Sequence, residues 1–224
     1  QNISKVKYWS KSMPKPTQRV KNVIAFIEQL IVPSGKGAGK PFKLKPFQKK
    51  FINDIYGPTK DERRIVRRAI LSMSRKNGKT ALVSCLALTH LVGPEAVRNG
   101  EIYSAATERN QAAIIFKYAA QIVRADPELE SYLKIVDSTK TMVCFSNGSI
   151  YRAISSEAGS KMGYNPTVVI YDELAQAKNR ELYDALDTSM GARMGEGEEP
   201  LFIVISTQAK DPQHILSQLI DDGL

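Results

Sequence analysis

The segment that decides the fold is residues 74–80, which read Ser74-Arg75-Lys76-Asn77-Gly78-Lys79-Thr80. An apolar run at residues 65–73 precedes this segment, and another at residues 81–91 follows it. That order predicts a strand, a glycine-bearing turn and a helix that begins at Gly-Lys-Thr, which is the layout of a phosphate-binding P-loop. Backbone N–H groups of such a turn and the positive end of the helix dipole face the phosphates.

Two residues of this turn carry the expected chemistry. A lysine such as Lys79 supplies positive charge to the β and γ phosphate oxygens, and a hydroxyl such as that of Thr80 helps to hold Mg²⁺. The usual pattern is G-x-x-x-x-G-K-[ST], and Met73 stands at the position of its first glycine. The segment is therefore a variant P-loop. The alternative is an ordinary helix N-terminus with small capping residues.

The composition is that of a globular protein with an excess of positive charge. The chain has 224 residues, of which 42% are hydrophobic and 25% charged, which is enough for one sizeable α/β domain and excludes wholesale disorder. The net charge of +9 suits a nucleic acid partner, although a basic surface is also a common solubility device. Cys85 and Cys144 lie in apolar runs without zinc-binding spacing, so we expect reduced core residues. No apolar run approaches the length of a membrane span, and we expect no membrane partner.

Strand and helix patterns alternate along the chain. Apolar periodicity predicts helices at residues 17–31, within 42–56, and at 81–91, 108–124 and 180–190, with shorter helices opening at Asp126-Pro127 and Asp211-Pro212. Strands are predicted at residues 65–73, 101–107, 141–145, 150–154, 167–171 and 201–205, and an exposed loop at 191–200. This alternation predicts a mostly parallel central sheet flanked by helices. We divide the chain into an N-terminal arm and helix, residues 1–41, and a P-loop domain, residues 42–224.

Polar residues follow two of the predicted strands. Ligands of parallel sheets bind beyond the carboxyl ends of the strands, and Asp172-Glu173 follows the strand at residues 167–171. We expect Asp172 to orient Mg²⁺ and Glu173 to activate the attacking water as general base. Alone, an Asp-Glu pair after a strand is a simple helix N-cap. Downstream of a P-loop, it predicts an ATP-hydrolysing domain.

Two further segments can be interpreted either as functional motifs or as ordinary structural segments. Ser206-Thr207-Gln208 follows the last strand, where a third motif of motor ATPases senses the γ-phosphate, and the alternative is a capped loop. The amide of Gln48 offers a donor and an acceptor to the edge of adenine, and Phe47 can stack on the base. The alternative there is a helix N-terminus with a buried Phe47 and an exposed Gln48.

Together these motifs resemble the large terminase subunit of tailed bacteriophages, the ATPase that packages DNA into the procapsid. The resemblance covers the chain from about Phe42 onward. It is carried by Pro46-Phe47-Gln48 as the adenine motif, by residues 74–80 as the variant P-loop, by Val168-Val169-Ile170-Tyr171-Asp172-Glu173 as the Walker B strand, and by Ser206-Thr207-Gln208 as the coupling motif.

The resemblance implies a P-loop NTPase of the additional-strand-conserved-Glu type that uses ATP and Mg²⁺. It implies double-stranded DNA, a portal protein and a small terminase subunit as partners, a homo-oligomeric ring, and action in the host cell cytoplasm at the procapsid portal. The residues that it implies are Glu173, Lys79 and Arg75 for catalysis; Phe47, Gln48, Ser74, Arg75, Lys76, Asn77, Gly78, Lys79 and Thr80 for nucleotide binding; Thr80 and Asp172 for the metal; and Ser206, Thr207 and Gln208 for coupling.

This chain departs from the family pattern in two respects. A neighbouring subunit of the ring can supply an arginine finger from the segment before the Walker B strand, but residues 155–166 hold no arginine. Lys161 is the only cation there, and Arg152 and Arg193 are the other candidates. The family also carries a C-terminal nuclease with a cluster of acidic metal ligands. Because no such cluster follows in this chain, we expect cleavage to belong to a further domain.

Two other functions stay open at this stage. A superfamily-2 helicase domain also pairs a glutamine motif with Gly-Lys-Thr and Asp-Glu, although Leu174-Ala175 and the loop arginine Arg75 depart from that class. Met73 at the first glycine position suggests a DNA-binding module that binds nucleotide without turnover. Intact Lys79 and Glu173 argue against that module.

Overall fold

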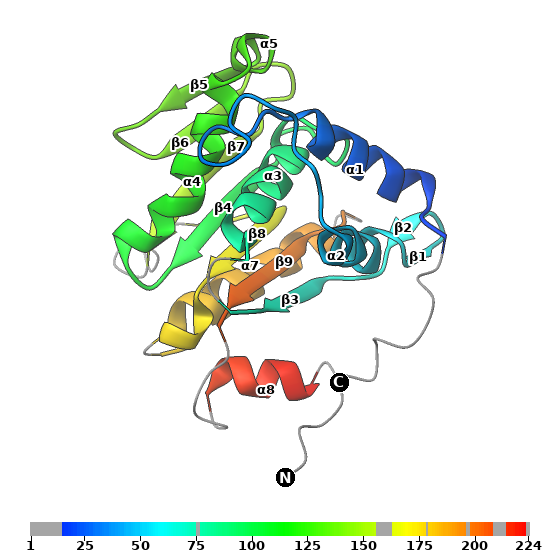
Figure 1. Cartoon of the computed structure of the whole chain (residues 1–224). Coiled ribbons are helices and arrows are strands. Elements are labelled where there is room, and N and C mark those ends of the chain that lie inside the picture. The colour runs from blue at the N-terminus through cyan, green and yellow to red at the C-terminus, as the bar shows by residue number, and fades with distance from the viewer. Residues whose placement is uncertain are drawn as a thin grey trace.

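A seven-stranded sheet flanked by helices forms the centre of the molecule (Figure 1). The computed structural model describes residues 15–74, 77–155, 163–177, 179–195, 198–207 and 214–222. Over these residues, no helix has the length and apolar character needed to cross a membrane.

The strand order of the large sheet is β3-β9-β8-β4-β7-β6-β5. Its strands are β3 (Arg68–Ser72), β4 (Glu101–Ala106), β5 (Leu133–Val136), β6 (Thr141–Cys144), β7 (Ile150–Ser155), β8 (Val168–Asp172) and β9 (Leu201–Ser206). The five strands from β3 to β7 in this order run parallel, and β6 and β5 complete the sheet as antiparallel strands. Because β9 lies between the P-loop strand β3 and the Asp-Glu strand β8, the predicted additional-strand type of P-loop fold is confirmed.

Helices cover both faces of the sheet. They are α1 (Gln18–Gln29), α2 (Pro46–Tyr56), α3 (Lys79–Leu91), α4 (Arg109–Arg124), α5 (Pro127–Ser131), the short 3-10 helix η1 (Leu174–Gln176), α7 (Glu181–Gly195) and α8 (Ile215–Asp222). Alternate residues of each central strand face opposite sides, so β8 sends Val168 and Ile170 into the core under α1 to α4. Val169 and Tyr171 enter the core under α7 and α8. A strand buried on both faces explains the continuous apolar sequence of this segment.

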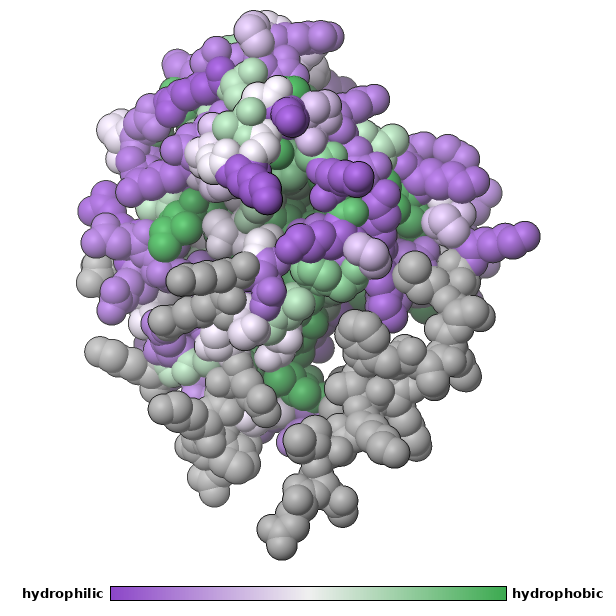
Figure 2. Space-filling view, in the orientation of Figure 1, coloured by the Kyte–Doolittle hydropathy of each residue, from purple (hydrophilic) through white to green (hydrophobic). Residues whose placement is uncertain are grey.

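On the face of the molecule drawn in Figure 2, the surface is mostly polar. Figure 2 shows hydrophilic side chains over most of the visible face, with apolar side chains in small groups between them.

Cys85 and Cys144 are buried and free, so the predicted reduced core cysteines are confirmed.

Helix α1 packs into the same core as the sheet. Thr17 caps it by accepting a hydrogen bond from the backbone N–H of Val20 at 3.3 Å. Val20, Val23 and Ile27 are fully buried in the core that also holds α3 and α4. The boundary that we placed between residues 41 and 42 stays a prediction, but α1 shares its apolar contacts with the P-loop domain.

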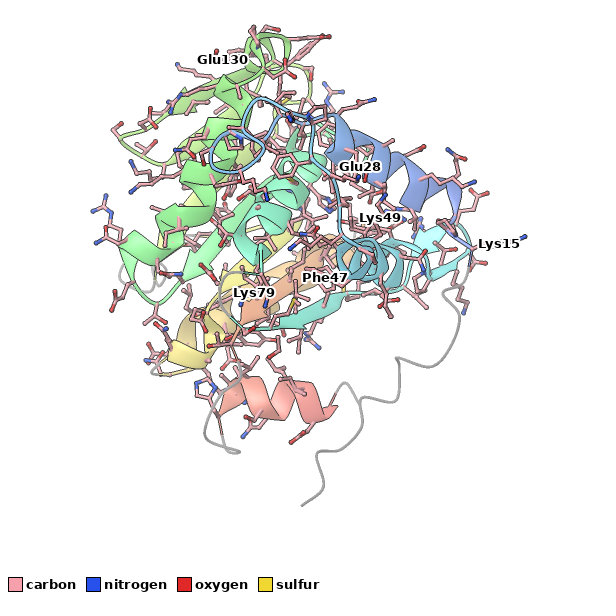
Figure 3. All side chains as sticks on the ribbon, viewed as in Figure 1. Lys15, Glu28, Phe47, Lys49, Lys79 and Glu130 are labelled. Carbon is pink, nitrogen blue, oxygen red and sulfur yellow. The ribbon has the colours of Figure 1, made fainter. Side chains whose placement is uncertain are left out.

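Ion pairs add polar connections to this packing. Arg19 of α1 contacts Glu95 after α3 at 2.6 Å and Glu199 before β9 at 2.8 Å. Lys49 of α2 pairs with Glu28 of α1 at 2.8 Å, and both are labelled in Figure 3. The Lys49 pair is partly exposed at the surface, where an ion pair contributes little to stability. Arg19 joins three separate segments and therefore fixes how α1 sits on the domain.

Four details differ from the sequence prediction. The strand predicted at residues 65–73 begins only at Arg68. The loop predicted at residues 191–200 is wrong over its first half, because α7 continues to Gly195. Buried Arg193 anchors that last turn through tertiary contacts, which outweigh the poor helix propensity of Gly191. Strand β5 and the ribbon of β1 (Thr59–Lys60) and β2 (Arg63–Arg64) were not predicted, since cross-strand pairing creates them.

Replacing Ile27 by alanine tests whether α1 belongs to the same cooperative unit as the sheet. Because Ile27 is fully buried, we expect Ile27→Ala to lower the free energy of unfolding by about 3 kcal/mol, measured by urea denaturation. Lys21→Ala on the exposed side of α1 is the control and should change it by less than about 0.5 kcal/mol. If Ile27→Ala does not shift the main unfolding transition to lower urea concentration, α1 folds independently of the sheet.

Candidate functional site

Three adjacent strands end at the same edge of the sheet. Ser72 at the end of β3 lies opposite Ser206 of β9, and Asp172 at the end of β8 lies opposite Ile205 of β9. The P-loop, Asp172-Glu173 and the segment after β9 therefore meet there, as the sequence predicted. Beside them is a cavity of about 670 Å³, lined by residues 77–81, three side chains of α4, Asp172, Glu173 and Gln176.

The P-loop is shaped by its own polar groups. Gly78 adopts a left-handed conformation with φ of 78°, which favours glycine and which brings the chain into α3. The amide of Asn77 donates to the hydroxyl of Ser74 at 2.7 Å. The ammonium group of Lys79 donates to the carbonyl oxygens of Met73 at 2.5 Å and Ser74 at 3.1 Å. Free N–H groups at the start of α3 give this loop the character of an anion site.

Asp172 is a buried carboxylate at the cavity wall. Its side chain accepts a hydrogen bond at Oδ2 from Nε2 of Gln111 at 2.6 Å. Burial raises the pKa of Asp172 to about 6, although the Gln111 hydrogen bond and the charge of Lys79 oppose this effect. Thr80 lines the same cavity and brings a hydroxyl oxygen.

The donor set fits a magnesium ion better than a transition metal. Asp172 and Thr80 offer oxygen atoms, and Mg²⁺ is usually held by one or two carboxylates together with water and substrate phosphates. Among the described residues there is no group of three or more His, Cys, Asp or Glu side chains that could hold a metal without a ligand. Around such an ion, water and the phosphate oxygens of a ligand would complete the coordination.

Glu173 is held by the segment that follows β9. Its Oε1 accepts hydrogen bonds from the backbone N–H of Thr207 at 2.9 Å, the Thr207 hydroxyl at 2.5 Å and the Ser206 hydroxyl at 3.2 Å. Burial acts to raise the pKa of Glu173, but the donors on Thr207 and Ser206 outweigh it and the pKa is lowered. Glu173 itself has a positive φ of 52°, a conformation that this hydrogen bonding compensates.

Phe47 and Gln48 lie near the P-loop but do not line this cavity. Gln48 is buried, so the alternative of an exposed Gln48 is wrong. Its Oε1 accepts a hydrogen bond from the backbone of Lys45 at 2.8 Å, and its Nε2 lies beside Gly78. Phe47 is partly exposed on α2, and Figure 3 labels it together with Lys79 at the start of α3.

The candidates for a finger acting on a neighbouring subunit differ in their surroundings. Arg193 is a poor candidate, because its buried guanidinium donates to Glu198 at 2.9 Å and to the carbonyl oxygens of Asn165 and Asn99. Arg152 is partly buried within β7. Lys161 lies outside the described residues, as do Arg75, Lys76 and Gln208.

Sequence reasoning missed the contribution of α4. Gln111, Ile114 and Tyr118 line the cavity from one face of this helix. Their spacing of three and four residues is a signal for a shared helix face, and the helix follows a strand that ends at this edge of the sheet. Only the apolar face of α4 was used in the prediction.

Comparison with known proteins identifies the family. Residues 46–222 match the family model described as the terminase large subunit, ATPase domain. The chain belongs to this family. Membership in a family of ATPase domains implies nucleotide binding, for which Mg²⁺ is the usual metal.

Individual relatives agree with this assignment. The chain is 43% identical to the large terminase subunit of Enterobacteria phage HK97 over 92% of its own length and 40% of that protein. It matches the crystal structure of the HK97 large terminase with a TM-score of 0.82 and 42% identity, over 92% of this chain and 41% of that one. The terminase ATPase domain described here thus spans about two fifths of the length of these relatives.

Two more distant structures share the fold. The large terminase ATPase domain of Thermus phage P74-26 matches with a TM-score of 0.53 and 18% identity, over 75% of this chain and 72% of that one. The UvsW helicase of bacteriophage T4 matches with a TM-score of 0.55 and 14% identity, over 93% of this chain and 66% of that one. At these identities the likeness concerns the fold alone.

Replacing Asp172 by asparagine should stabilise the protein at neutral pH. The pKa of about 6 lies above the ordinary value of 3.8, so the folded state binds the proton more tightly than the unfolded chain. Ionised Asp172 therefore lowers stability above pH 6, and this cost disappears below pH 4. The difference of about 2 pKa units corresponds to about 2 to 3 kcal/mol.

Urea denaturation of Asp172→Asn and of the unchanged protein at pH 8 and pH 4 measures this effect. Asp54→Asn is the control, because Asp54 is exposed and pairs only at the surface with Lys50. Equal stability of Asp172→Asn and the unchanged protein at pH 8 would contradict the burial of an ionised carboxylate.

Proposed function

We propose that this domain hydrolyses ATP and that, in a complete terminase large subunit, hydrolysis drives double-stranded DNA into a procapsid. The observation that carries the proposal is the convergence of the P-loop and Asp172-Glu173 on one cavity, with Ser206 and Thr207 hydrogen-bonded to Glu173. The partners would be a portal protein, a small terminase subunit and further copies of this chain in a ring. The place of action would be the host cytoplasm, at the procapsid portal.

The P-loop would bind the phosphates of ATP. Lys79 and the N–H groups at the start of α3 would contact the β and γ phosphate oxygens, with Ser74, Arg75, Lys76 and Asn77 completing the loop. Thr80 and Asp172 would hold Mg²⁺, which when bound neutralises charge on phosphate oxygens. Phe47 and Gln48 would contact the adenine, from a position beside Gly78.

Glu173 would act as the general base. A water oxygen attacks the γ-phosphorus, the bond to the ADP oxygen breaks, and the water proton passes to the Glu173 carboxylate. A base must be ionised at working pH, and the lowered pKa of Glu173 meets that requirement. Three donors on Oε1 hold the carboxylate in one orientation before substrate binds.

Ser206 and Thr207 would couple phosphate binding to movement, together with Gln208. The carbonyl oxygen of Ser206 accepts a hydrogen bond from the N–H of Met73 at 3.0 Å, while its hydroxyl contacts Glu173. One residue thus touches both the strand end that enters the P-loop and the general base. A shift of this segment when phosphate leaves would be felt by both.

Two parts of the proposed function involve contacts with other molecules, namely a trans-acting finger and the grip on DNA. Lys161 and Arg152 remain the candidates for the finger, whereas the contacts of Arg193 argue for a structural role. Basic residues that contact DNA phosphates without reading sequence would make binding weaken steeply with salt. Family membership favours a translocase over a helicase, and duplex separation by the purified protein would favour the helicase.

Replacing Glu173 by glutamine tests the proposed reaction. We expect Glu173→Gln to bind ATP with unchanged affinity and to hydrolyse it about 10²- to 10⁴-fold more slowly, because the amide cannot accept the water proton. Hydrolysis is measured as phosphate release with and without double-stranded DNA, over a series of protein and salt concentrations. A rate that rises more than linearly with protein concentration would support a finger supplied by a neighbouring subunit.

Glu181→Gln is the matched control, since Glu181 is an exposed carboxylate in the first turn of α7. It should hydrolyse ATP like the unchanged protein. Hydrolysis by Glu173→Gln at the normal rate would show that Glu173 is not the base. ATP binding without hydrolysis by the unchanged protein under all these conditions would instead support a nucleotide-binding module.

Replacing Thr207 by valine tests the hold on Glu173. Valine keeps the shape and the backbone N–H but removes the hydroxyl that lies 2.5 Å from Oε1, so the pKa of Glu173 should rise. Less of the base is then ionised in acid, and the acid limb of the pH–rate profile should move to higher pH. Above pH 7 we expect the rate to fall by about fivefold or less, the loss of one hydrogen bond. Thr59→Val in the exposed ribbon of β1 and β2 is the control. If Thr207→Val and Thr59→Val have the same pH–rate profile, the Thr207 hydroxyl does not set the pKa of Glu173.

A further inference from the structure

Gln111 lies outside all the sequence motifs, yet it contacts Asp172 of the Walker B motif. Nε2 of Gln111 donates to Oδ2 of Asp172 at 2.6 Å, across 61 residues of sequence. Gln111 belongs to the first turn of α4, and Asp172 is the last residue of β8. The amide also lines the cavity that the P-loop shares.

The fold holds Gln111 in a fixed place. β4 lies next to β8, with Ala105 opposite Tyr171, and α4 begins shortly after β4 ends. Two fully buried serine hydroxyls secure the first turns of α4. Ser104 of β4 donates to the carbonyl oxygen of Ala112 at 3.2 Å, and Ser84 of α3 donates to that of Ile115 at 3.1 Å. The donor is therefore delivered by a helix that is tied to both the sheet and α3.

An amide suits the task of orienting this carboxylate. The terminal torsion of an aspartate is soft, so an unsupported carboxylate samples a broad range of orientations. Asp172 is 5% exposed, which leaves little room for water to fix it. The Gln111 amide carries no charge, and its N–H group holds one carboxylate oxygen and thereby sets the direction of the other. Such outer partners of metal ligands typically change metal affinity by about 10- to 100-fold when removed.

We propose that Gln111 is a positioning residue that holds the Asp172 carboxylate in the orientation needed to bind Mg²⁺ together with nucleotide. This inference rests on the proposed function, in which Asp172 and Thr80 hold the metal. It adds α4 to the site, because a residue of that helix controls a group at the end of β8. Nucleotide binding without metal depends on the P-loop and does not involve this contact.

The test is the effect of Mg²⁺ on nucleotide affinity in two variants. Gln111→Met keeps the length and helix propensity of the side chain but removes the donor, and Gln111→Ala is a second variant that is also a good helix former. Gln121→Met on the exposed face of the same helix is the matched control. The dissociation constant of the non-hydrolysable analogue AMP-PNP is measured by calorimetry for the 224-residue chain, with Mg²⁺ and with EDTA, and thermal unfolding verifies folding.

We expect both Gln111 variants to bind AMP-PNP about tenfold more weakly with Mg²⁺ and with unchanged affinity in EDTA. Gln121→Met should match the unchanged protein in both conditions. An unchanged effect of Mg²⁺ in the Gln111 variants would overturn the inference and leave the proposed function intact. Equal weakening with and without metal would also overturn it, because Gln111 would then serve the nucleotide or the loop. An unchanged protein whose affinity does not respond to Mg²⁺ would refute the proposed metal site itself, and the inference with it.

Discussion

The site depends on the position of β9 between β3 and β8. Two backbone hydrogen bonds continue the sheet past the ends of these strands, from Met73 N–H to the Ser206 carbonyl at 3.0 Å and from Glu173 N–H to the Ile205 carbonyl at 2.8 Å. In this register every residue of β8 and β9 is buried, and a slip by one residue would send each side chain to the opposite face of the sheet. The last residues of β9 are thus placed between the phosphate-binding turn and the two carboxylates.

Asp172 and Glu173 are neighbours in sequence, yet their surroundings move their pKa values in opposite directions. Burial dominates at Asp172 and raises its pKa, since the Gln111 hydrogen bond and the charge of Lys79 do not offset the loss of water. At Glu173 three donors act on a single oxygen and lower the pKa. Pairs of carboxylates whose environments separate their pKa values are typical of sites in which each has its own task. The difference arises because Glu173 is hydrogen-bonded by the end of β9 and the residue after it, whereas Asp172 is hydrogen-bonded by Gln111 of α4.

Local patterns in the sequence predicted most of the fold. Runs such as residues 167–171 and the helical spacing of Val20, Val23 and Ile27 reflect burial that is decided within one element. The motif residues could also be located, since strand ends in a parallel sheet meet at one edge. Features that depend on distant partners could not be predicted. Strand β5 exists through its pairing with β6, and Gln111 meets Asp172 only because β4 lies beside β8.

Helix α1 lies outside the domain as the family model defines it, but inside the domain as its hydrophobic core defines it. The segment shared with the terminase family model starts at residue 46, after α1 has ended. The apolar side chains of α1 nevertheless complete the core, and Arg19 joins the helix to the loop after α3 and to the segment before β9. An excised fragment that begins at residue 46 would keep every motif but expose the apolar surface that α1 covers. The smallest piece that can carry the chemistry is therefore shorter than the smallest piece with an intact interior.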